Sequence, residues 1–140
     1  MRLDLITLSG VKYSAEAYSV QLPTASGVET VLPNHEPLMS VLTPGVIIIR
    51  KNQKDPDSSL EHYATYGGVV EVTGEDVRVL VDEADQGDEI NEAEAEKARA
   101  AAQDMLRNAN NQVELERAQS AIDRHAVRLQ VAQLKRRTRH

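Results

Sequence analysis

The side chains that could do acid–base or metal chemistry are spread thinly along this sequence. The histidines are His35, His62, His125 and His140, and no two of them have the short spacing of a metal-binding motif. We interpret His125 as a packed or partly exposed histidine on a helix rather than a ligand. Cysteine is absent, which removes thiolate metal sites, cysteine nucleophiles and disulfides. The sequence therefore predicts no local metal site and no catalytic cysteine.

Three other patterns bear on phosphate, hydrolase and calcium chemistry. Gly67-Gly68 follows an apolar run but lacks the later Lys and Ser or Thr of a phosphate-binding loop, so a strand turn or bulge is favoured. No Gly-x-Ser-x-Gly elbow is present. The acidic run 82–89 does not have the spacing of a calcium-binding EF-hand loop, and a solvated linker is favoured there. The sequence predicts a protein that binds partners, not an enzyme and not one that holds a cofactor.

Charge divides the chain into two halves. Its 140 residues carry a net charge of −6, with 15 acids against 6 bases in residues 1–90 and 7 against 10 in residues 91–140. An acidic protein without aromatic residues after Tyr66 is a poor candidate for nucleic-acid binding. No apolar run is long enough to cross a bilayer, and Asp4 interrupts the stretch where an export signal would begin.

The elements that must position any site change type near residue 87. Short apolar runs separated by turn signals predict an antiparallel β-sandwich, or flattened barrel, over residues 1–87. Pro23 is expected to end strand pairing, and residues 51–59 are expected to form an exposed hairpin loop. The expected strands cover residues 3–8, 18–22, 28–32, 46–49, 62–66, 69–72 and 77–81.

Residues 88–140 are predicted to form an antiparallel hairpin of two helices. Asn91 with Glu94, and Asn111 with Glu114, match a helix N-cap followed by an acid three residues later. Asn108 to Asn111 breaks the helical pattern between them. The two predicted seams are Ala95, Ala98, Ala102, Met105 and Ala109, facing Leu115, Ala118, Ile122, His125, Leu129 and Ala132.

This seam holds few large apolar side chains. Burying Met105, Leu115, Ile122 and Leu129 would contribute about 2 kcal/mol each, whereas ordering the segment costs about 1.5 kcal/mol per residue before helical hydrogen bonds offset part of it. We therefore expect the hairpin to need a docking surface and to exchange between surfaces.

A rigid corner, Leu32-Pro33-Asn34-His35-Glu36-Pro37-Leu38, carries the most specific pattern in the sequence. Its two prolines bracket a polar turn between apolar strands. With the segments 22–27, 42–45, 67–72 and 77–84, this corner resembles the epsilon subunit family of bacterial F-type ATP synthases in order and spacing. The resemblance covers the β-rich half, and a two-helix tail follows where the family has one.

The resemblance implies a non-catalytic subunit of the central stalk, the rotor that couples the c-ring and the gamma subunit to the catalytic head. It implies c-ring contact through Gly27, Val28, Glu29 and Thr30, and gamma contact through His35, Pro37 and Leu42. Thr30 departs from the family, which often has Gly there. It also implies a peripheral location on the cytoplasmic face of the bacterial cell membrane, with membrane contact only through the complex.

For residues 88–140 the resemblance implies a tail that modulates ATP hydrolysis by meeting acidic segments of the alpha and beta catalytic subunits. The residues that would make these contacts are Arg124, Arg128, Lys135, Arg136 and Arg137. Many members also bind ATP at the start of the first tail helix through an acid and an arginine. Here Asn91 replaces the acid and Glu94 replaces the arginine, so we predict weak or absent ATP binding, because a carboxylate there repels phosphate.

The residues alone leave one alternative open. A β-sandwich with a coiled helical tail also fits a free-standing regulatory adaptor, which would not co-purify with a gamma subunit.

Overall fold

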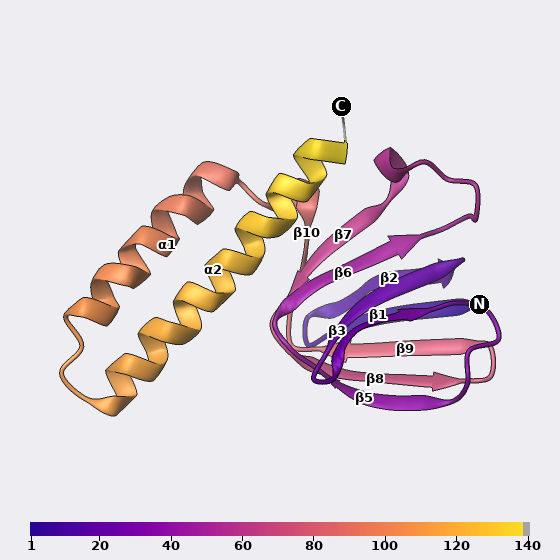
Figure 1. Ribbon diagram of the computed structural model, residues 1–140, viewed down its shortest axis with the longest axis horizontal. Helices are drawn as coiled ribbons and strands as arrows, with labels where there is room; N and C mark the ends of the chain where they lie inside the picture. Colours follow the sequence, from indigo (N-terminus) through magenta and orange to yellow (C-terminus); the bar gives the residue numbers. More distant parts are fainter. Residues whose placement is uncertain (139–140) are drawn as a thin grey trace.

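The computed structural model describes residues 1–138. Figure 1 shows a curved sheet of ten strands with two helices lying beside it. The strands are β1 (Arg2–Thr7), β2 (Gly10–Glu16), β3 (Ser19–Thr24), β4 (Gly27–Val31), β5 (Leu38–Leu42), β6 (Gly45–Arg50), β7 (Glu61–Thr65), β8 (Gly68–Thr73), β9 (Asp76–Val81) and β10 (Ala84–Gln86). Two short 3-10 turns, η1 (Asp57–Ser59) and η2 (Gly87–Glu89), precede β7 and the helices.

The strands follow the order β10-β7-β6-β3-β5-β8-β9-β1-β2, and β4 pairs with β3 off this path. All of these pairs are antiparallel except β1 with β9, which is parallel. The predicted sandwich, or flattened barrel, is confirmed. The parallel pair joins β9 to the first strand, a non-local contact that no local pattern predicts.

Alternation builds one core inside the sandwich. In β9, Val77, Val79 and Val81 are buried, while the residues between them are exposed, as expected when every second side chain faces the core. Leu3 and Leu5 of β1 contribute the same way. Because the chain contains no Phe or Trp, aliphatic side chains fill most of this core, with Tyr13 and Tyr63 as its aromatic members.

Two local predictions are wrong. Pro23 does not end strand pairing but lies inside β3, opposite Val28. Its carbonyl accepts a hydrogen bond from the Thr43 amide at 2.9 Å. Proline tolerates a strand position where no ladder N–H is needed.

The acidic run is not entirely a solvated linker, because residues 84–86 form β10, paired with β7, and Ala84 is buried.

The helices are α1 (Glu92–Arg107) and α2 (Gln112–Thr138). Both predicted caps are confirmed: the Asn91 side chain accepts from the Glu94 amide at 3.0 Å, and Asn111 accepts from the Glu114 amide at 2.9 Å. The Glu114 carboxylate accepts in turn from the amide of Asn110 at 2.8 Å. The helices run antiparallel, as predicted (Figure 1).

Helix α2 lies between α1 and the sandwich (Figure 1). Its Val127 and Val131 join a buried cluster with Ala64 of β7. The predicted seam is wrong at two large residues, because Met105 is 54% and Leu115 is 39% exposed. The larger apolar side chains of α2 pack against the sheet, whereas the seam between the two helices is built from buried alanines such as Ala102 and Ala118.

Candidate interaction surfaces

A row of exposed apolar side chains crosses the outer face of the sandwich. Strand register places Val41 opposite Val69, Val69 opposite Leu80, Leu80 opposite Ile6 and Ile6 opposite Val11. Val41 is 60%, Val69 40%, Leu80 40% and Val11 63% exposed, and Ile6 is half-buried. We name these five residues the apolar row. A contiguous exposed apolar patch on a folded domain marks an interaction surface.

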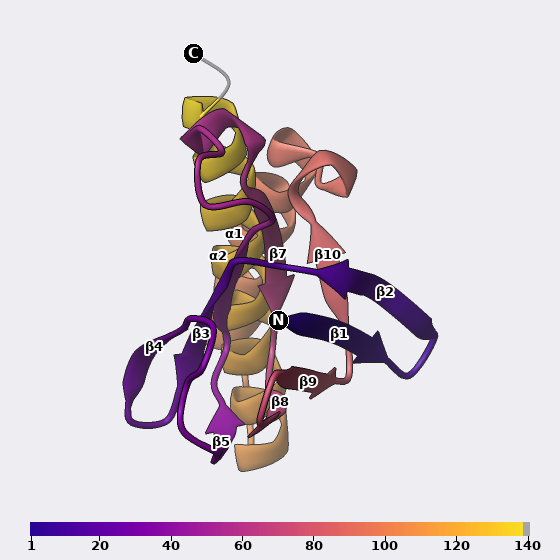
Figure 2. The ribbon, with the colours of Figure 1, turned by 90° about the vertical axis from the view of Figure 1, so that its right-hand side faces the viewer.

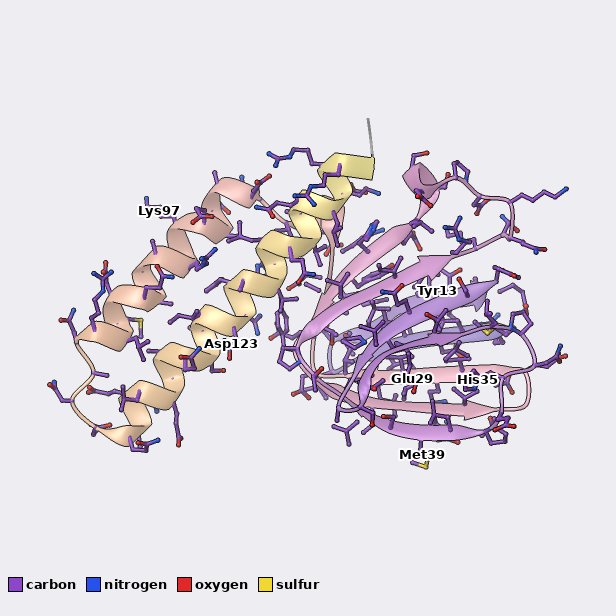
Figure 3. The ribbon with its side chains drawn as sticks, viewed as in Figure 1. Tyr13, Glu29, His35, Met39, Lys97 and Asp123 are labelled. Atoms are coloured by element: carbon purple, nitrogen blue, oxygen red, sulfur yellow. The ribbon has the colours of Figure 1, made fainter. Side chains whose placement is uncertain are left out.

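A polar row lies beside the apolar row on the same strands. Register aligns Met39 with Glu71, Glu71 with Arg78 and Arg78 with Asp4. Met39 is 76% exposed and its side chain points away from the sandwich in Figure 3. Asp4 accepts a hydrogen bond from Ser14 of β2 at 2.6 Å. An apolar strip edged by charges is the usual composition of a protein–protein interface.

The segment predicted to contact a c-ring forms the second strand of a β-hairpin. Figure 2 shows β4 projecting at the edge of the sandwich. Gly27 has φ of 115°, and the hydroxyl of Thr24 donates to its carbonyl at 2.6 Å. Val28 is 68% exposed, Thr30 is exposed, and Glu29 is half-buried. Because β4 pairs only with β3, its outer edge and Val28 are open to a partner.

The corner between β4 and β5 is a tight, exposed turn. Asn34 has φ of 67°, and the amide of His35 donates to the carbonyl of Leu32 at 3.2 Å. The His35 ring lies 2.7 Å from the carbonyl of Glu36, and Pro37 is exposed. These contacts fix the shape of the corner.

Leu42 does not suit the role of a partner contact. Its side chain is 3% exposed and lies in the sandwich core, because β5 alternates inward and outward. The outward side chains of that strand are Met39 and Val41. The predicted contact at Leu42 therefore falls on the buried face of β5.

Helix α2 carries a row of basic side chains that meets the acidic segment 83–92 of the same chain. We name Arg124, Arg128, Lys135 and Arg136 the basic row. The pairs are Arg124 with Glu83, Arg128 with Asp85 at 2.6 Å, Lys135 with Asp88 at 3.7 Å and Arg136 with Glu92 at 3.4 Å. Four of the five basic residues predicted to meet a partner are thus engaged within the chain, and Arg137, the fifth, is exposed.

Tyr66 contacts both the Arg124–Glu83 pair and the Arg128–Asp85 pair. Its hydroxyl donates to Asp85 at 2.8 Å, and the guanidinium of Arg124 lies 4.3 Å from the centre of its ring. Burial first, and then the hydrogen bond to Asp85, raise the pKa of Tyr66, so its hydroxyl stays protonated and acts as a donor. A cation over an aromatic face adds about 0.5–1 kcal/mol at such a site.

The start of α1 lies next to the end of the basic row. Gly87, Asp88, Ile90 and Glu92 form a hollow with Ala132, Lys135 and Arg136 of α2. Its acids and bases pair with each other. Asn91 uses its side-chain oxygen to cap α1, and Glu94 is exposed. Neither residue supplies the acid or the arginine that the family motif uses.

Among residues 1–138, no cluster of three or more His, Cys, Asp or Glu side chains is placed to hold a metal ion. Within the same range, no helix is both long enough and apolar enough to cross a bilayer. His140 lies outside the described residues.

Sequence reasoning missed the apolar row, although a signal for it exists. In β9 the buried valines leave Arg78 and Leu80 on the solvent face. An apolar residue at a position where alternation predicts a polar one is the signal. Only the sheet order shows that Leu80, Val69 and Val41 are neighbours across three strands.

Two family models match consecutive parts of the chain. The model described as ATP synthase, Delta/Epsilon chain, beta-sandwich domain matches residues 1–87. The model described as ATP synthase, Delta/Epsilon chain, long alpha-helix domain matches residues 88–133. The chain is also 39% identical over 136 residues to a protein named ATP synthase epsilon chain from Herpetosiphon aurantiacus, covering 97% of this chain and 96% of that one.

Solved structures share the fold. One is a subunit of the Euglena gracilis mitochondrial ATP synthase, with a TM-score of 0.80, 20% identity, and coverage of 94% of this chain and 79% of that chain. Another comes from the central stalk and c-ring structure of the Tetrahymena thermophila mitochondrial ATP synthase, with a TM-score of 0.60, 15% identity, and coverage of 94% and 96%.

Proposed function

The chain belongs to the ATP synthase delta/epsilon chain family, and we propose that it is a non-catalytic subunit of the rotating central stalk of a bacterial F-type ATP synthase that translocates protons. In that role the sandwich binds the gamma subunit and the c-ring, and the hairpin modulates ATP hydrolysis at the alpha and beta subunits. The protein would then lie on the cytoplasmic face of the cell membrane, held there by the complex.

The observation that carries this proposal is the apolar row. Val41, Val69 and Leu80 are each at least 40% exposed on a sheet face that no element of the described chain covers. Exposing such a strip to water is unfavourable by about 25 cal/mol for each Å². A permanent partner on that face removes this penalty, and we propose that the partner is the gamma subunit.

The neighbouring polar row gives that partner its register. Glu71 and Arg78 lie opposite each other at the edge of the strip, where complementary charges select the partner and its orientation. The corner with His35 and Pro37 leads directly into β5. We therefore replace Leu42 by Met39 and Val41 as the proposed gamma contacts on that strand.

The c-ring is proposed to meet the β3–β4 hairpin. This hairpin projects from the sandwich (Figure 2), and it presents Val28 and the free edge of β4. Gly27, Glu29 and Thr30 complete this contact surface.

Co-expression with the gamma subunit of the same complex tests the proposal. The unmodified chain should co-purify with gamma. Val41→Lys combined with Leu80→Lys should weaken binding by at least about tenfold, because each lysine would be buried without a partner in the interface. Copy numbers in the purified complex, measured by quantitative mass spectrometry, give the readout.

Val113→Lys is the matched control, because Val113 is 58% exposed against 60% for Val41 but lies on α2. It should leave co-purification unchanged. Failure of the unmodified chain to capture gamma would instead favour the free-standing adaptor. An equal loss of gamma binding in the Val41 and Leu80 double variant and in Val113→Lys would reject the apolar row as the gamma site.

A further inference from the structure

A histidine lies beneath the docked helix. His62 of β7 is 2% exposed. Its strand neighbour Tyr63 belongs to the sandwich core, so alternation turns His62 to the other face, where Ala64 packs against α2. Across the sheet, His62 stands opposite Ile48 of β6. An ionisable ring is thus buried between the sheet and the hairpin.

The neutral form of His62 suits this position and the charged form does not. Its Nδ1 is buried and has no hydrogen-bond partner among the described residues. The charged group that acts on the ring is Lys135 of α2. Burial first, and the positive charge of Lys135 second, lower the pKa of His62. Protonation would add a second cation beside Lys135 with no water to solvate it.

Carboxylates on the surrounding elements are already committed to other cations. The pairs are Asp57 of η1 with Arg50, Glu61 of β7 with Lys51, Asp85 of β10 with Arg128, Asp88 of η2 with Lys135 and Glu89 of η2 with Lys12. Of these acids, Asp88 bears most directly on His62, because it pairs with Lys135 and so partly neutralises the charge that acts on the ring. No ion pair between His62 and any of these acids is formed.

We propose that His62 is a proton-sensitive latch for the hairpin: neutral His62 allows α2 to cover β7, and protonation of His62 releases the hairpin from the sandwich. Undocking lets water solvate both the imidazolium and Lys135. It also separates Arg124 from Glu83 and Arg128 from Asp85, because both acids stay with the sandwich. In the complex, which rests on the function proposed above, this frees Arg124 and Arg128 for acidic surfaces of the catalytic subunits.

The direction of the pH effect follows from the two states of His62. Undocked, the ring has an ordinary pKa of 6.5, and docking lowers that pKa. The undocked state therefore binds the proton more tightly, so docking is strongest above pH 6.5 and weakens as the pH falls below it. One proton gives a change of up to about tenfold in the docking equilibrium per pH unit.

Energy transfer between two dyes on the isolated full-length chain tests the latch. Cysteine is absent from the sequence, so Glu75→Cys in the β8–β9 turn and Ser120→Cys on α2 provide two exposed labelling sites. Transfer should be constant above pH 7 and should change between pH 7 and pH 5.5 as the hairpin leaves. His62→Gln should remain docked through the same range, and His62→Asn is a second neutral substitution if the first does not fold.

Two other histidines serve as controls. His35→Gln removes a half-buried histidine in the corner between β4 and β5, away from α2, and should retain the pH response. His125→Gln removes the other histidine with a buried, unpartnered Nδ1 and should also retain it. Constant transfer in the parent chain, an unchanged response in His62→Gln, or a response lost in His125→Gln instead would overturn the proposal.

The test separates the latch from the proposed function. It uses the isolated chain, so it needs neither gamma nor the catalytic subunits. Loss of gamma co-purification would reject the stalk role and leave the latch standing. A pH-independent hairpin would reject the latch and leave the stalk role standing.

Discussion

Nη1 of Arg128 lies 2.6 Å from Oδ2 of Asp85, and this ion pair joins α2 to the last strand of the sheet. The same carboxylate oxygen accepts a hydrogen bond from the hydroxyl of Tyr66 at 2.8 Å. The Arg128 and Asp85 side chains are only 26% and 25% exposed, so water screens the pair less than it screens a surface pair. This contact should contribute more to hairpin docking than any other pair in the basic row.

Arg128→Gln should shift the hairpin toward its undocked state. The substitution leaves Asp85 charged and only partly solvated, which we expect to weaken docking by about 1–2 kcal/mol, or roughly five- to thirtyfold. Dye-pair energy transfer at pH 7.5 measures the shift. Arg124→Gln is the matched control: its pair with Glu83 is 38% and 51% exposed and should contribute less than about 1 kcal/mol. Equal effects of the two substitutions would contradict this ranking.

Removal of residues 88–140 should raise ATP hydrolysis by the assembled complex. If the hairpin is the regulatory element, its loss removes the basic row that would otherwise meet the acidic catalytic subunits. The measurement compares hydrolysis rates of complexes containing the full chain or the truncated chain at equal copy number. The truncated sandwich retains the apolar row, so it should still assemble, and an unchanged rate in a complete complex would argue against inhibition by the tail.

Calorimetric titration of the chain with ATP should give no binding in the micromolar range. Glu94 brings a negative charge to the position where many family members have an arginine, and Asn91 is occupied in capping α1. Asn91→Asp combined with Glu94→Arg restores both charges and keeps a capping side chain, so this variant should bind more tightly. Micromolar affinity in the unmodified chain would refute the prediction.

Gly68→Ala should destabilise the sandwich strongly. Gly68 has φ of 156°, and a Cβ there would lie 2.2 Å from the carbonyl oxygen of Leu80 and 2.8 Å from the Cα of Val81. Strand β8 would have to move away from β9, which we expect to lower the free energy of unfolding by about 3 kcal/mol. Thermal or urea unfolding measures this change.

Gly74→Ala is the control for backbone strain alone. Gly74 has φ of 57° with no atom within 4 Å of a built Cβ. Its substitution should be unfavourable by only about 1–2 kcal/mol. If Gly74→Ala proved as damaging as Gly68→Ala, close approach of β8 and β9 would not explain the role of Gly68.

Local features were the ones that sequence could predict. The caps at Asn91 and Asn111 each use an amide only three residues away, so the helix starts were readable from spacing. The strand over residues 77–81 was predictable for the same reason, because its pattern is local. Predictions failed where a distant segment decided the outcome: β10 forms because β7 lies beside it, and Met105 is exposed because α2 turns its larger apolar side chains to the sheet.

The residue types of each surface could therefore be read from the sequence, but the way distant residues come together to form each surface could not. The basic end of the tail, the acidic segment before α1 and the scattered aliphatic residues are properties of composition and local period. Their pairing depends on contacts between residues far apart, such as Arg124 with Glu83 and Arg128 with Asp85, separated by 41 and 43 positions. The sheet order likewise aligned Val41, Val69 and Leu80, and the docked helix buried His62, because a non-local contact forms only where the whole core fixes two distant segments side by side.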